Sequence, residues 1–163
     1  MTIQVGDKIP DSTFTTLTSE GPQPITSADL FDGKKVALFA VPGAFTPTCH
    51  RDHLPGFIEH AARIKARGVD TIACVSVNDA FVMGAWDAQS GSDGAVLFLA
   101  DGNGDFTRAV GLEMDGTGFG MGERSRRYSM IVEDGKVTVL NIEPAAGQAE
   151  VSGAANLLDQ LQG

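Results

Sequence analysis

The chain has few basic residues: it carries 12 Lys and Arg against 21 Asp and Glu, and its formal net charge is -9. Nucleic acids and anionic membrane surfaces are bound through clustered Lys and Arg. Apolar runs are also short, and none approaches the ~20 residues that cross a bilayer. We therefore expect no nucleic-acid partner and no membrane partner, and we ascribe the acidity to solubility in water.

Cysteine is scarce, with two residues among 163, Cys49 and Cys74. The N-terminal segment lacks the basic stretch and the apolar core of a signal peptide, and it has too little Arg for an organelle transit peptide. We therefore expect a cytoplasmic location. Because a reducing compartment keeps thiols free, we expect an exposed cysteine to serve chemistry rather than a structural disulfide.

The sequence shows no repeats, low-complexity tracts or long linkers, so residues 1–163 are predicted to form one domain. The apolar run 36–41 is typical of a strand buried on both faces. Turn residues and helix-capping residues mark the boundaries of the other predicted strands and helices. The predicted elements are, in order, small strands or a hairpin within 1–30, a strand over 36–41, a helix over 50–67 ended by Gly68, a strand over 69–77, a helix over 80–88 capped by Asn78-Asp79, a strand over 95–99, a short helix ending at Val110, a hairpin of 128–133 with 136–141, and a helix over 152–161. This order predicts an α/β fold with a mixed sheet.

The most informative stretch runs from Pro42 to Cys49 and reads PGAFTPTC. It lies where the buried strand is predicted to turn into a helix, so Cys49 is expected near a helix N-terminus. Free N–H groups and the positive end of the helix dipole favour an anion there, and the thiolate is the reactive form of cysteine. The Thr46 hydroxyl can orient a polar substrate, and Pro42 and Pro47 stiffen the loop. The stretch therefore predicts a nucleophilic cysteine.

Pro42, Thr46 and Cys49 match the P-x-x-x-T-x-x-C signature of peroxiredoxins, which are thiol-dependent peroxidases. The chain resembles the type II subfamily, which includes peroxiredoxin 5, over nearly its whole length. The blocks that carry this resemblance are 41–49, 53–57, 75–82 and 124–130. The resemblance implies a thioredoxin-like fold with a central mixed β-sheet flanked by helices and a small N-terminal β-hairpin. It also implies an antioxidant enzyme that needs no cofactor and forms a homodimer.

By this resemblance Cys49 is the peroxidatic cysteine, whose thiolate attacks hydrogen peroxide or an organic hydroperoxide and becomes a sulfenic acid. Arg127, which precedes an aromatic residue at a predicted strand start, would hold the thiolate and donate to the peroxide oxygens. Thr46 would form a hydrogen bond with the peroxide and the thiolate. Pro42 would shield the thiolate from water.

Further residues are expected to support this site. His53, one helical turn past the cysteine, could face the same pocket and polarise it, or lie exposed in solvent. Backbone N–H groups within 43–49, that of Gly43 included, are expected to complete the contacts to oxygen. Strand alternation puts residues 126 and 127 on opposite faces, so Arg126 is expected at the surface. Arg124 could support the site from farther out.

Cys74 lies inside a predicted strand, where a buried and inert thiol is expected. Some type II relatives carry a late resolving cysteine shortly before the last helix, and Val151 stands at that place here. A bond between Cys49 and Cys74 would need Cα atoms within ~7 Å and local unwinding of the first helix, so Cys74 is a weak candidate. The sequence predicts a one-cysteine cycle, in which glutathione with glutaredoxin, or thioredoxin, reduces the sulfenic acid.

Two other functions remain open at this point. Cys49, His50, His53 and Cys74 are of types that bind zinc, but they lack paired C-x-x-C spacing, and we expect no metal. A redox sensor or chaperone-like module would relay the oxidation of Cys49 to a partner protein.

The Gly-rich stretch 116–122 lacks a preceding predicted strand and the G-K-[ST] ending of a phosphate loop. It is predicted to be a flexible loop near the pocket or at a subunit contact.

Overall fold

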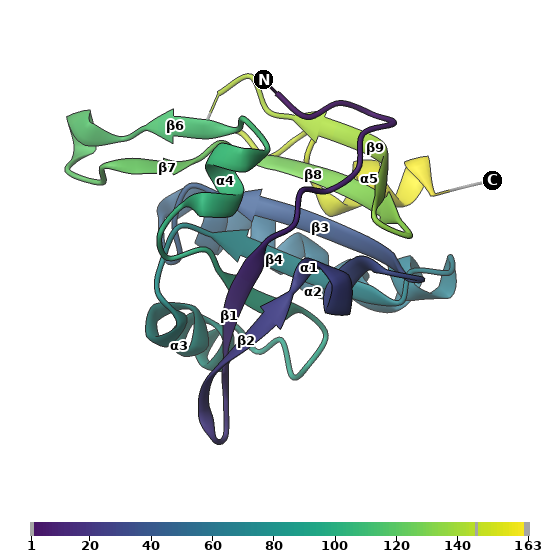
Figure 1. Ribbon diagram of the computed structural model, residues 1–163, viewed down its shortest axis with the longest axis horizontal. Helices are drawn as coiled ribbons and strands as arrows, with labels where there is room; N and C mark the ends of the chain where they lie inside the picture. The colour runs from purple at the N-terminus through teal and green to yellow at the C-terminus, as the bar shows by residue number, and fades with distance from the viewer. Residues whose placement is uncertain (1, 146, 162–163) are drawn as a thin grey trace.

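A computed structural model describes residues 2–145 and 147–161 of the chain. Its centre is a seven-stranded sheet in the order β2-β1-β5-β4-β3-β8-β9 (Figure 1). The strands are β1 (Thr13–Thr18), β2 (Gly21–Thr26), β3 (Lys35–Val41), β4 (Thr71–Ser76), β5 (Leu97–Ala100), β8 (Tyr128–Glu133) and β9 (Lys136–Ile142). β3, β4 and β5 run parallel, whereas β8 is antiparallel to β3. The sheet is therefore mixed, as predicted, and the β1–β2 hairpin extends one edge of it.

The packing of β3 explains why its sequence is apolar from Val36 to Val41. Ala37, Phe39 and Val41 pack into a core on one face of the sheet, and the residues between them pack into a core on the other face. Both faces of this strand are covered from Val36 to Val41, so these six positions favour apolar side chains. β3 thus forms the rigid centre from which the loop after Val41 leaves.

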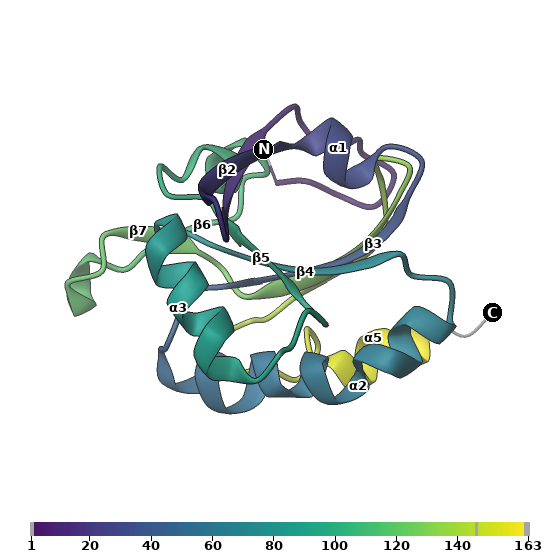
Figure 2. The same ribbon diagram turned by 90° about the horizontal axis from the view of Figure 1, so that it is seen from below.

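Helices cover the sheet on both sides (Figure 2). α2 (Leu54–Ala66), α3 (Ala80–Ser90) and α5 (Ala154–Gln160) bury their apolar faces in the core that contains Phe39. The short helices α1 (Ser27–Phe31) and α4 (Asp105–Ala109) pack on the opposite core. The predicted caps are confirmed where Asp79 Oδ1 accepts the backbone N–H of Val82 at 2.8 Å and where Gly68 adopts a φ of 93° after α2.

The Gly-rich stretch 116–122 is a loop, as predicted, but it connects two short strands that were not predicted. β6 (Glu113–Asp115) and β7 (Glu123–Ser125) form a separate two-stranded sheet that projects from the body of the molecule (Figure 1), with η2 (Thr117–Phe119) between them. Gly116 is required at its turn, because a Cβ there would lie 2.8 Å from the backbone oxygen of Gly122. Three-residue strands carry too little pattern to be seen in the sequence, so this hairpin was missed.

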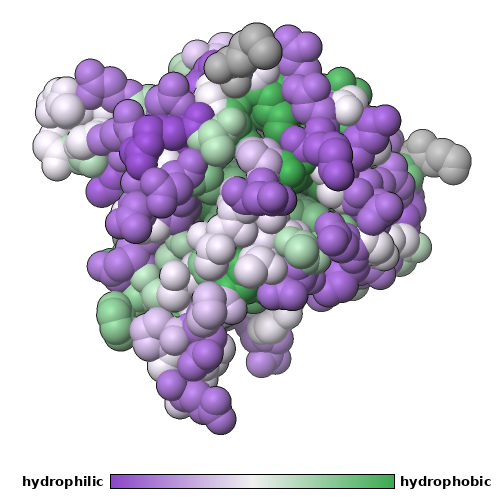
Figure 3. Space-filling view, in the orientation of Figure 1, coloured by the Kyte–Doolittle hydropathy of each residue, from purple (hydrophilic) through white to green (hydrophobic). Residues whose placement is uncertain are grey.

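The face of the molecule seen in Figure 3 is largely hydrophilic, with apolar atoms showing between polar side chains. Within the described part of the chain, every helix is too short or too polar to cross a membrane.

Candidate active site

The loop after β3 turns sharply into a helix. It enters helical structure at Pro47, and its first turn is a π-helix, η1 (Cys49–His53), which leads into α2. Phe45 adopts a φ of 65° in this loop, a conformation that is rare for a bulky side chain and typical of functional sites. The loop is held by the Ala44 N–H, which donates to Asn78 Oδ1 at 3.0 Å. The predicted strand-to-helix turn around Cys49 is therefore confirmed, with a wider first turn than expected.

Two side chains form hydrogen bonds with the Cys49 sulfur. Thr46 Oγ1 lies 2.8 Å from Sγ, and Arg127 Nη2 donates to Sγ at 2.9 Å. Cys49 itself is 0% exposed. Its burial differs from that of an inert core thiol, since a hydroxyl and a guanidinium contact it. Cys49 therefore belongs to the apolar core, with two polar side chains at its sulfur.

Thr46 has two acceptors within reach of one proton. Its Oγ1 also lies 2.7 Å from the backbone oxygen of Gly43, and a carbonyl oxygen can only accept. Beside a neutral thiol, the hydroxyl donates to Gly43 and accepts from sulfur. Beside a thiolate, the Thr46 hydroxyl instead donates its hydrogen bond to the sulfur. The same side chain can thus serve both ionisation states of Cys49.

His53 is buried against the arginine rather than exposed in solvent. Its Nε2 lies 3.0 Å from the backbone oxygen of Ser152, and its Nδ1 lies 3.0 Å from Arg127 Nη1. Because the carbonyl only accepts, Nε2 carries the proton and Nδ1 accepts from Arg127. Burial lowers the pKa of His53 from 6.5 to about 3, and the nearby Arg127 adds to this decrease, against the opposing effect of the Ser152 carbonyl. His53 is therefore neutral and holds the guanidinium in place.

The three neighbouring arginines have different positions. Arg127 is 3% exposed and contacts both Cys49 and His53. Arg126 donates from Nη2 to the backbone oxygen of Glu143 at 3.5 Å rather than to the sulfur. Arg124 lies on β7 and donates from Nη1 to the backbone oxygen of Pro42 at 3.3 Å. The structure thus brings Arg127 to the sulfur and places Arg124 against the loop.

Gly43 and Pro42 shape the loop beside the cysteine. A Cβ on Gly43 would lie 2.9 Å from Arg124 Nη1 and 3.1 Å from Thr46 Cγ2, so the close approach of these side chains requires glycine. The Pro42 backbone oxygen anchors Arg124, as described above, and Pro42 itself is buried. These contacts fix the path of the loop around Thr46.

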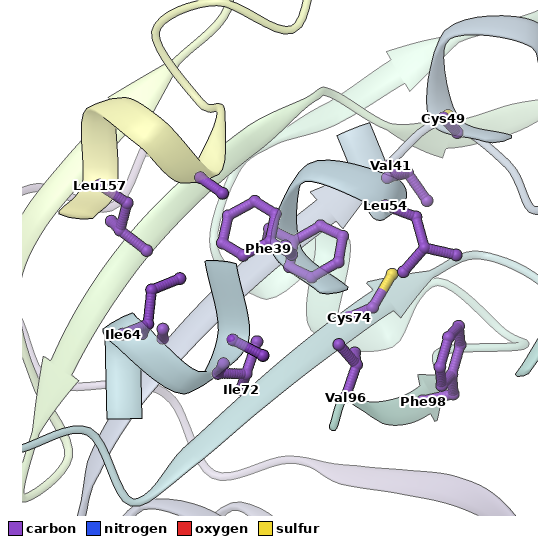
Figure 4. Close-up of a cluster of buried hydrophobic side chains, with 14 of the residues drawn as sticks. Phe39, Val41, Cys49, Leu54, Ile64, Ile72, Cys74, Val96, Phe98 and Leu157 are labelled. Carbon is purple, nitrogen blue, oxygen red and sulfur yellow. The ribbon is translucent and has the colours of Figure 1, made fainter. Parts of the chain in front are cut away.

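Cys74 lies in β4 within the apolar core, where Figure 4 shows its sulfur pointing toward Leu54. It is paired in register with Phe39 and is 0% exposed. Burial raises the pKa of the Cys74 thiol well above its usual value, and the nearby Cys49 adds to this increase. The prediction of a buried thiol in a strand is confirmed. Both cysteines are free.

Two features around the site were missed in the sequence. Trp86 Nε1 donates to His50 Nδ1 at 3.1 Å, and the ring of Phe45 lies 6.1 Å from that of Trp86. Farther along the chain, Glu143 is buried and binds the segment that contacts His53. The sequence pattern signals neither contact, because each joins residues from separate elements. Among the described residues, no group of three or more His, Cys, Asp or Glu side chains is placed to hold a metal ion.

Comparison with known proteins gives consistent matches along the chain. The Redoxin family model matches residues 4–158. The chain is 53% identical over 165 residues to Peroxiredoxin-2E-2, chloroplastic, of Oryza sativa subsp. japonica, covering 98% of this chain and 73% of that protein. A solved structure of reduced Prx3 in complex with H2O2 from Vibrio vulnificus has a TM-score of 0.93 and 53% identity, covering 98% of this chain and 99% of that one. The crystal structure of peroxiredoxin 5 from Alvinella pompejana has a TM-score of 0.86 and 37% identity, covering 98% of both chains.

Proposed function

Since the chain belongs to the type II peroxiredoxins and is a thiol peroxidase whose peroxidatic residue is Cys49, we propose that it reduces hydrogen peroxide and organic hydroperoxides in a one-cysteine cycle. The observation that carries the chemistry is the pair of hydrogen bonds to the Cys49 sulfur, from Thr46 and from Arg127. Both donors stabilise negative charge on sulfur before the reaction and on oxygen during it.

The oxidation step proceeds by displacement at oxygen. The Cys49 thiolate attacks the terminal oxygen of the hydroperoxide, an S–O bond forms and the O–O bond breaks. The electron pair of that bond leaves with the second oxygen, which takes a proton and departs as water or an alcohol. Arg127 donates to the oxygen that gains charge, and Thr46 orients the peroxide. Cys49 is left as a sulfenic acid.

An external thiol completes the proposed cycle. Val151 occupies the place of the late resolving cysteine and is 41% exposed, while Cys74 is held in β4 with a raised pKa that makes it a poor nucleophile. Glutathione would attack the sulfenic acid, releasing water and leaving a mixed disulfide. Glutaredoxin with a second glutathione, or alternatively thioredoxin, would then free Cys49.

The experiment compares the two reductants side by side. Peroxide consumption is followed with glutathione and glutaredoxin in one reaction and with thioredoxin and its reductase in another. We expect turnover with external thiols and, after one equivalent of peroxide, an intact mass that shows a Cys49 sulfenic acid or a glutathione adduct. A 2 Da loss mapped to a Cys49–Cys74 disulfide would overturn the one-cysteine cycle.

We also propose that the protein acts as a homodimer, with residues 1–163 forming one domain in a reducing, cytoplasmic setting. Three phenylalanines support a subunit contact, because Phe119, Phe81 and Phe45 are 86%, 64% and 40% exposed, and large exposed apolar side chains are common at interfaces. Sedimentation equilibrium is expected to give twice the chain mass of 17.0 kDa. A mass of one chain at micromolar concentration would contradict the dimer.

A further inference from the structure

Glu143 is a buried carboxyl group at the end of β9, outside the set of residues that contact the sulfur. It is 3% exposed. Its Oε2 accepts two short hydrogen bonds from one residue, the backbone N–H of Ser152 at 2.7 Å and the Ser152 Oγ at 2.6 Å. The other carboxylate oxygen, Oε1, is buried and has no hydrogen-bond partner among the described residues. Such a group is costly to bury, so its role needs an explanation.

The position of Glu143 in the sheet ties it to the arginine. Its backbone N–H donates to the backbone oxygen of Arg127 at 2.9 Å, which continues the β8–β9 ladder by one pair beyond Tyr128 and Ile142. The backbone of Glu143 is therefore fixed to Arg127, while its side chain is fixed to Ser152. Glu143 thus joins Arg127, the residue before β8, to the segment that precedes α5.

The segment held by Glu143 supplies the acceptor for His53. The Ser152 backbone oxygen accepts from His53 Nε2 at 3.0 Å, and this bond sets the tautomer in which Nδ1 is free to accept. Nδ1 then accepts from Arg127 Nη1 at 3.0 Å, and Arg127 Nη2 reaches the Cys49 sulfur. A continuous chain of hydrogen bonds thus runs from Glu143 through Ser152, His53 and Arg127 to the sulfur.

We propose that Glu143 is a positioning residue for peroxide reduction, which clamps Ser152 so that His53 presents Nδ1 to Arg127 and aims the guanidinium at Cys49. The inference rests on oxidation of Cys49 by peroxide and is independent of the identity of the reductant. The clamp acts through accepted hydrogen bonds, so an uncharged acceptor of the same shape can replace the carboxylate. Outer contacts of this kind orient the groups that touch the reacting atoms.

The test uses a matched pair of variants. Glu143→Leu keeps the volume of the side chain but removes both acceptors, whereas Glu143→Gln keeps one oxygen that can accept from Ser152. Glu150→Leu makes the same change on an exposed carboxylate near Ser152 and serves as the control. The rate constant for oxidation of Cys49 by hydrogen peroxide is measured by stopped flow without any reductant, using the fluorescence of the single tryptophan, Trp86.

Glu143→Leu is expected to lower this rate constant 10- to 100-fold, and Glu143→Gln is expected to restore it to within about threefold of the parent. NMR of the His53 ring nitrogens supplies a readout that a purely structural role would not move. The parent should show protonated Nε2 and bare Nδ1 near neutral pH, and Glu143→Leu should shift both signals. Glu150→Leu should change neither the rate nor the signals.

Two results would overturn the proposal. One is a folded Glu143→Leu protein with parent rate and parent His53 signals; the other is a folded Glu143→Gln protein that is as slow as Glu143→Leu. Should Glu143→Leu fail to fold, Ser152→Ala decides the matter, because it removes the Oγ bond and keeps the N–H bond. A three- to tenfold lower rate with shifted His53 signals supports the clamp, and unchanged values for both refute it. Because no reductant is present, failure of the one-cysteine cycle would leave these readouts unaffected.

Discussion

Arg127 and Cys49 are joined by a hydrogen bond of 2.9 Å from Nη2 to Sγ, although 78 positions separate them in the chain. The register of the sheet accounts for this contact. β8 runs antiparallel to β3, with Tyr128 opposite Ala40, so the start of β8 lies beside the end of β3. The residue before Tyr128 and the loop after Val41 therefore meet at one edge of the core. The proximity of Arg127 to Cys49 is therefore a consequence of strand order.

Replacing Arg127 by Lys should lower the rate constant for Cys49 oxidation about 100-fold or more. Lysine keeps the charge but cannot donate to the sulfur and to His53 Nδ1 from one rigid plane, and loss of one aligned donor typically costs about 10²–10³ in rate. Stopped-flow fluorescence with hydrogen peroxide measures the effect. Arg126→Lys is the control and should stay near the parent rate. Equal losses of rate in both variants would mean that the effect does not depend on the hydrogen bonds of Arg127.

Thr46→Val should slow the same step, whereas Thr46→Ser should retain most of the rate. Valine has the shape of threonine without the hydroxyl that lies 2.8 Å from Sγ, and serine keeps that hydroxyl. Because a hydrogen bond to a charged group contributes about 1.5–3 kcal/mol, we expect a loss of about 10- to 100-fold in Thr46→Val. Rate constants for the two variants at one pH test this. A Thr46→Val rate equal to that of Thr46→Ser would show that the hydroxyl serves only the Gly43 carbonyl.

Cys49→Ser should abolish peroxide consumption, while Cys74→Ala should retain most of it. Cys74 is enclosed in the apolar core, so its removal leaves the hydrogen bonds from Thr46 and Arg127 to Cys49 in place. Alanine leaves a small cavity at a fully buried position, and we expect a stability loss of about 1 kcal/mol. Steady-state peroxide assays and urea unfolding separate the two effects. Loss of turnover in a folded Cys74→Ala protein would restore Cys74 as a resolving cysteine.

Much of this fold was predictable because its strong signals are local. The apolar run 36–41 identified a strand buried on both faces, and the Asp134-Gly135 turn identified the β8–β9 hairpin. The β6–β7 hairpin was missed because its strands have three residues each. The π-helical first turn at Cys49 was also missed. A single π-helical turn differs from an α-helical one in its backbone hydrogen bonds, and the spacing of apolar residues in the sequence does not reveal that difference.

The contacting residues of the site were predictable only in part. The loop from Pro42 to Cys49 is contiguous, so its chemistry could be read directly, and Arg127 followed from the family resemblance. The burial of His53 and the clamp at Glu143 depend on where the segment before α5 returns to the sheet. Glu143 follows an apolar strand and looks like a surface carboxylate in the sequence. Long-range packing alone makes it a buried partner of Ser152.

His53 should make the protein less stable as the pH falls below about 6.5. Its pKa is about 3 in the folded protein, against about 6.5 for an unperturbed histidine. Between these values the unfolded chain binds more protons, so the free energy of unfolding decreases with falling pH, by up to about 1.4 kcal/mol per pH unit from this group. Urea unfolding at pH 7, 6 and 5 should show a shallower decrease in His53→Gln than in the parent.

The matched control for this effect is His60→Gln, which replaces a partly buried histidine on α2 whose Nδ1 faces the backbone oxygen of Gly56. It lies away from the arginine and should keep the slope of the parent. An unchanged slope in His53→Gln would mean that another group causes the acid sensitivity.

Tyr128→Phe should stabilise the protein. Tyr128 is 1% exposed, and its hydroxyl has no hydrogen-bond partner among the described residues. An unsatisfied buried hydroxyl costs about 1–3 kcal/mol, so its removal should raise the free energy of unfolding by up to that amount. Urea unfolding at pH 7 measures the change. A loss of stability in Tyr128→Phe would instead reveal a partner for the hydroxyl, such as a buried water.

Alkaline pH gives an independent check on the same hydroxyl, because Tyr128 is the single tyrosine of the chain. Burial raises the pKa of Tyr128, and the nearby Asp101 and Cys74 add to the increase. Above about pH 10, where an unperturbed tyrosine ionises, the folded protein therefore binds more protons than the unfolded chain, and stability falls as the pH rises. Phenolate absorbance should appear only as the protein unfolds, and Tyr128→Phe should lose less stability between pH 10 and 11 than the parent. Phenolate absorbance that rises near pH 10 in the folded protein would mean that the ring is accessible to water.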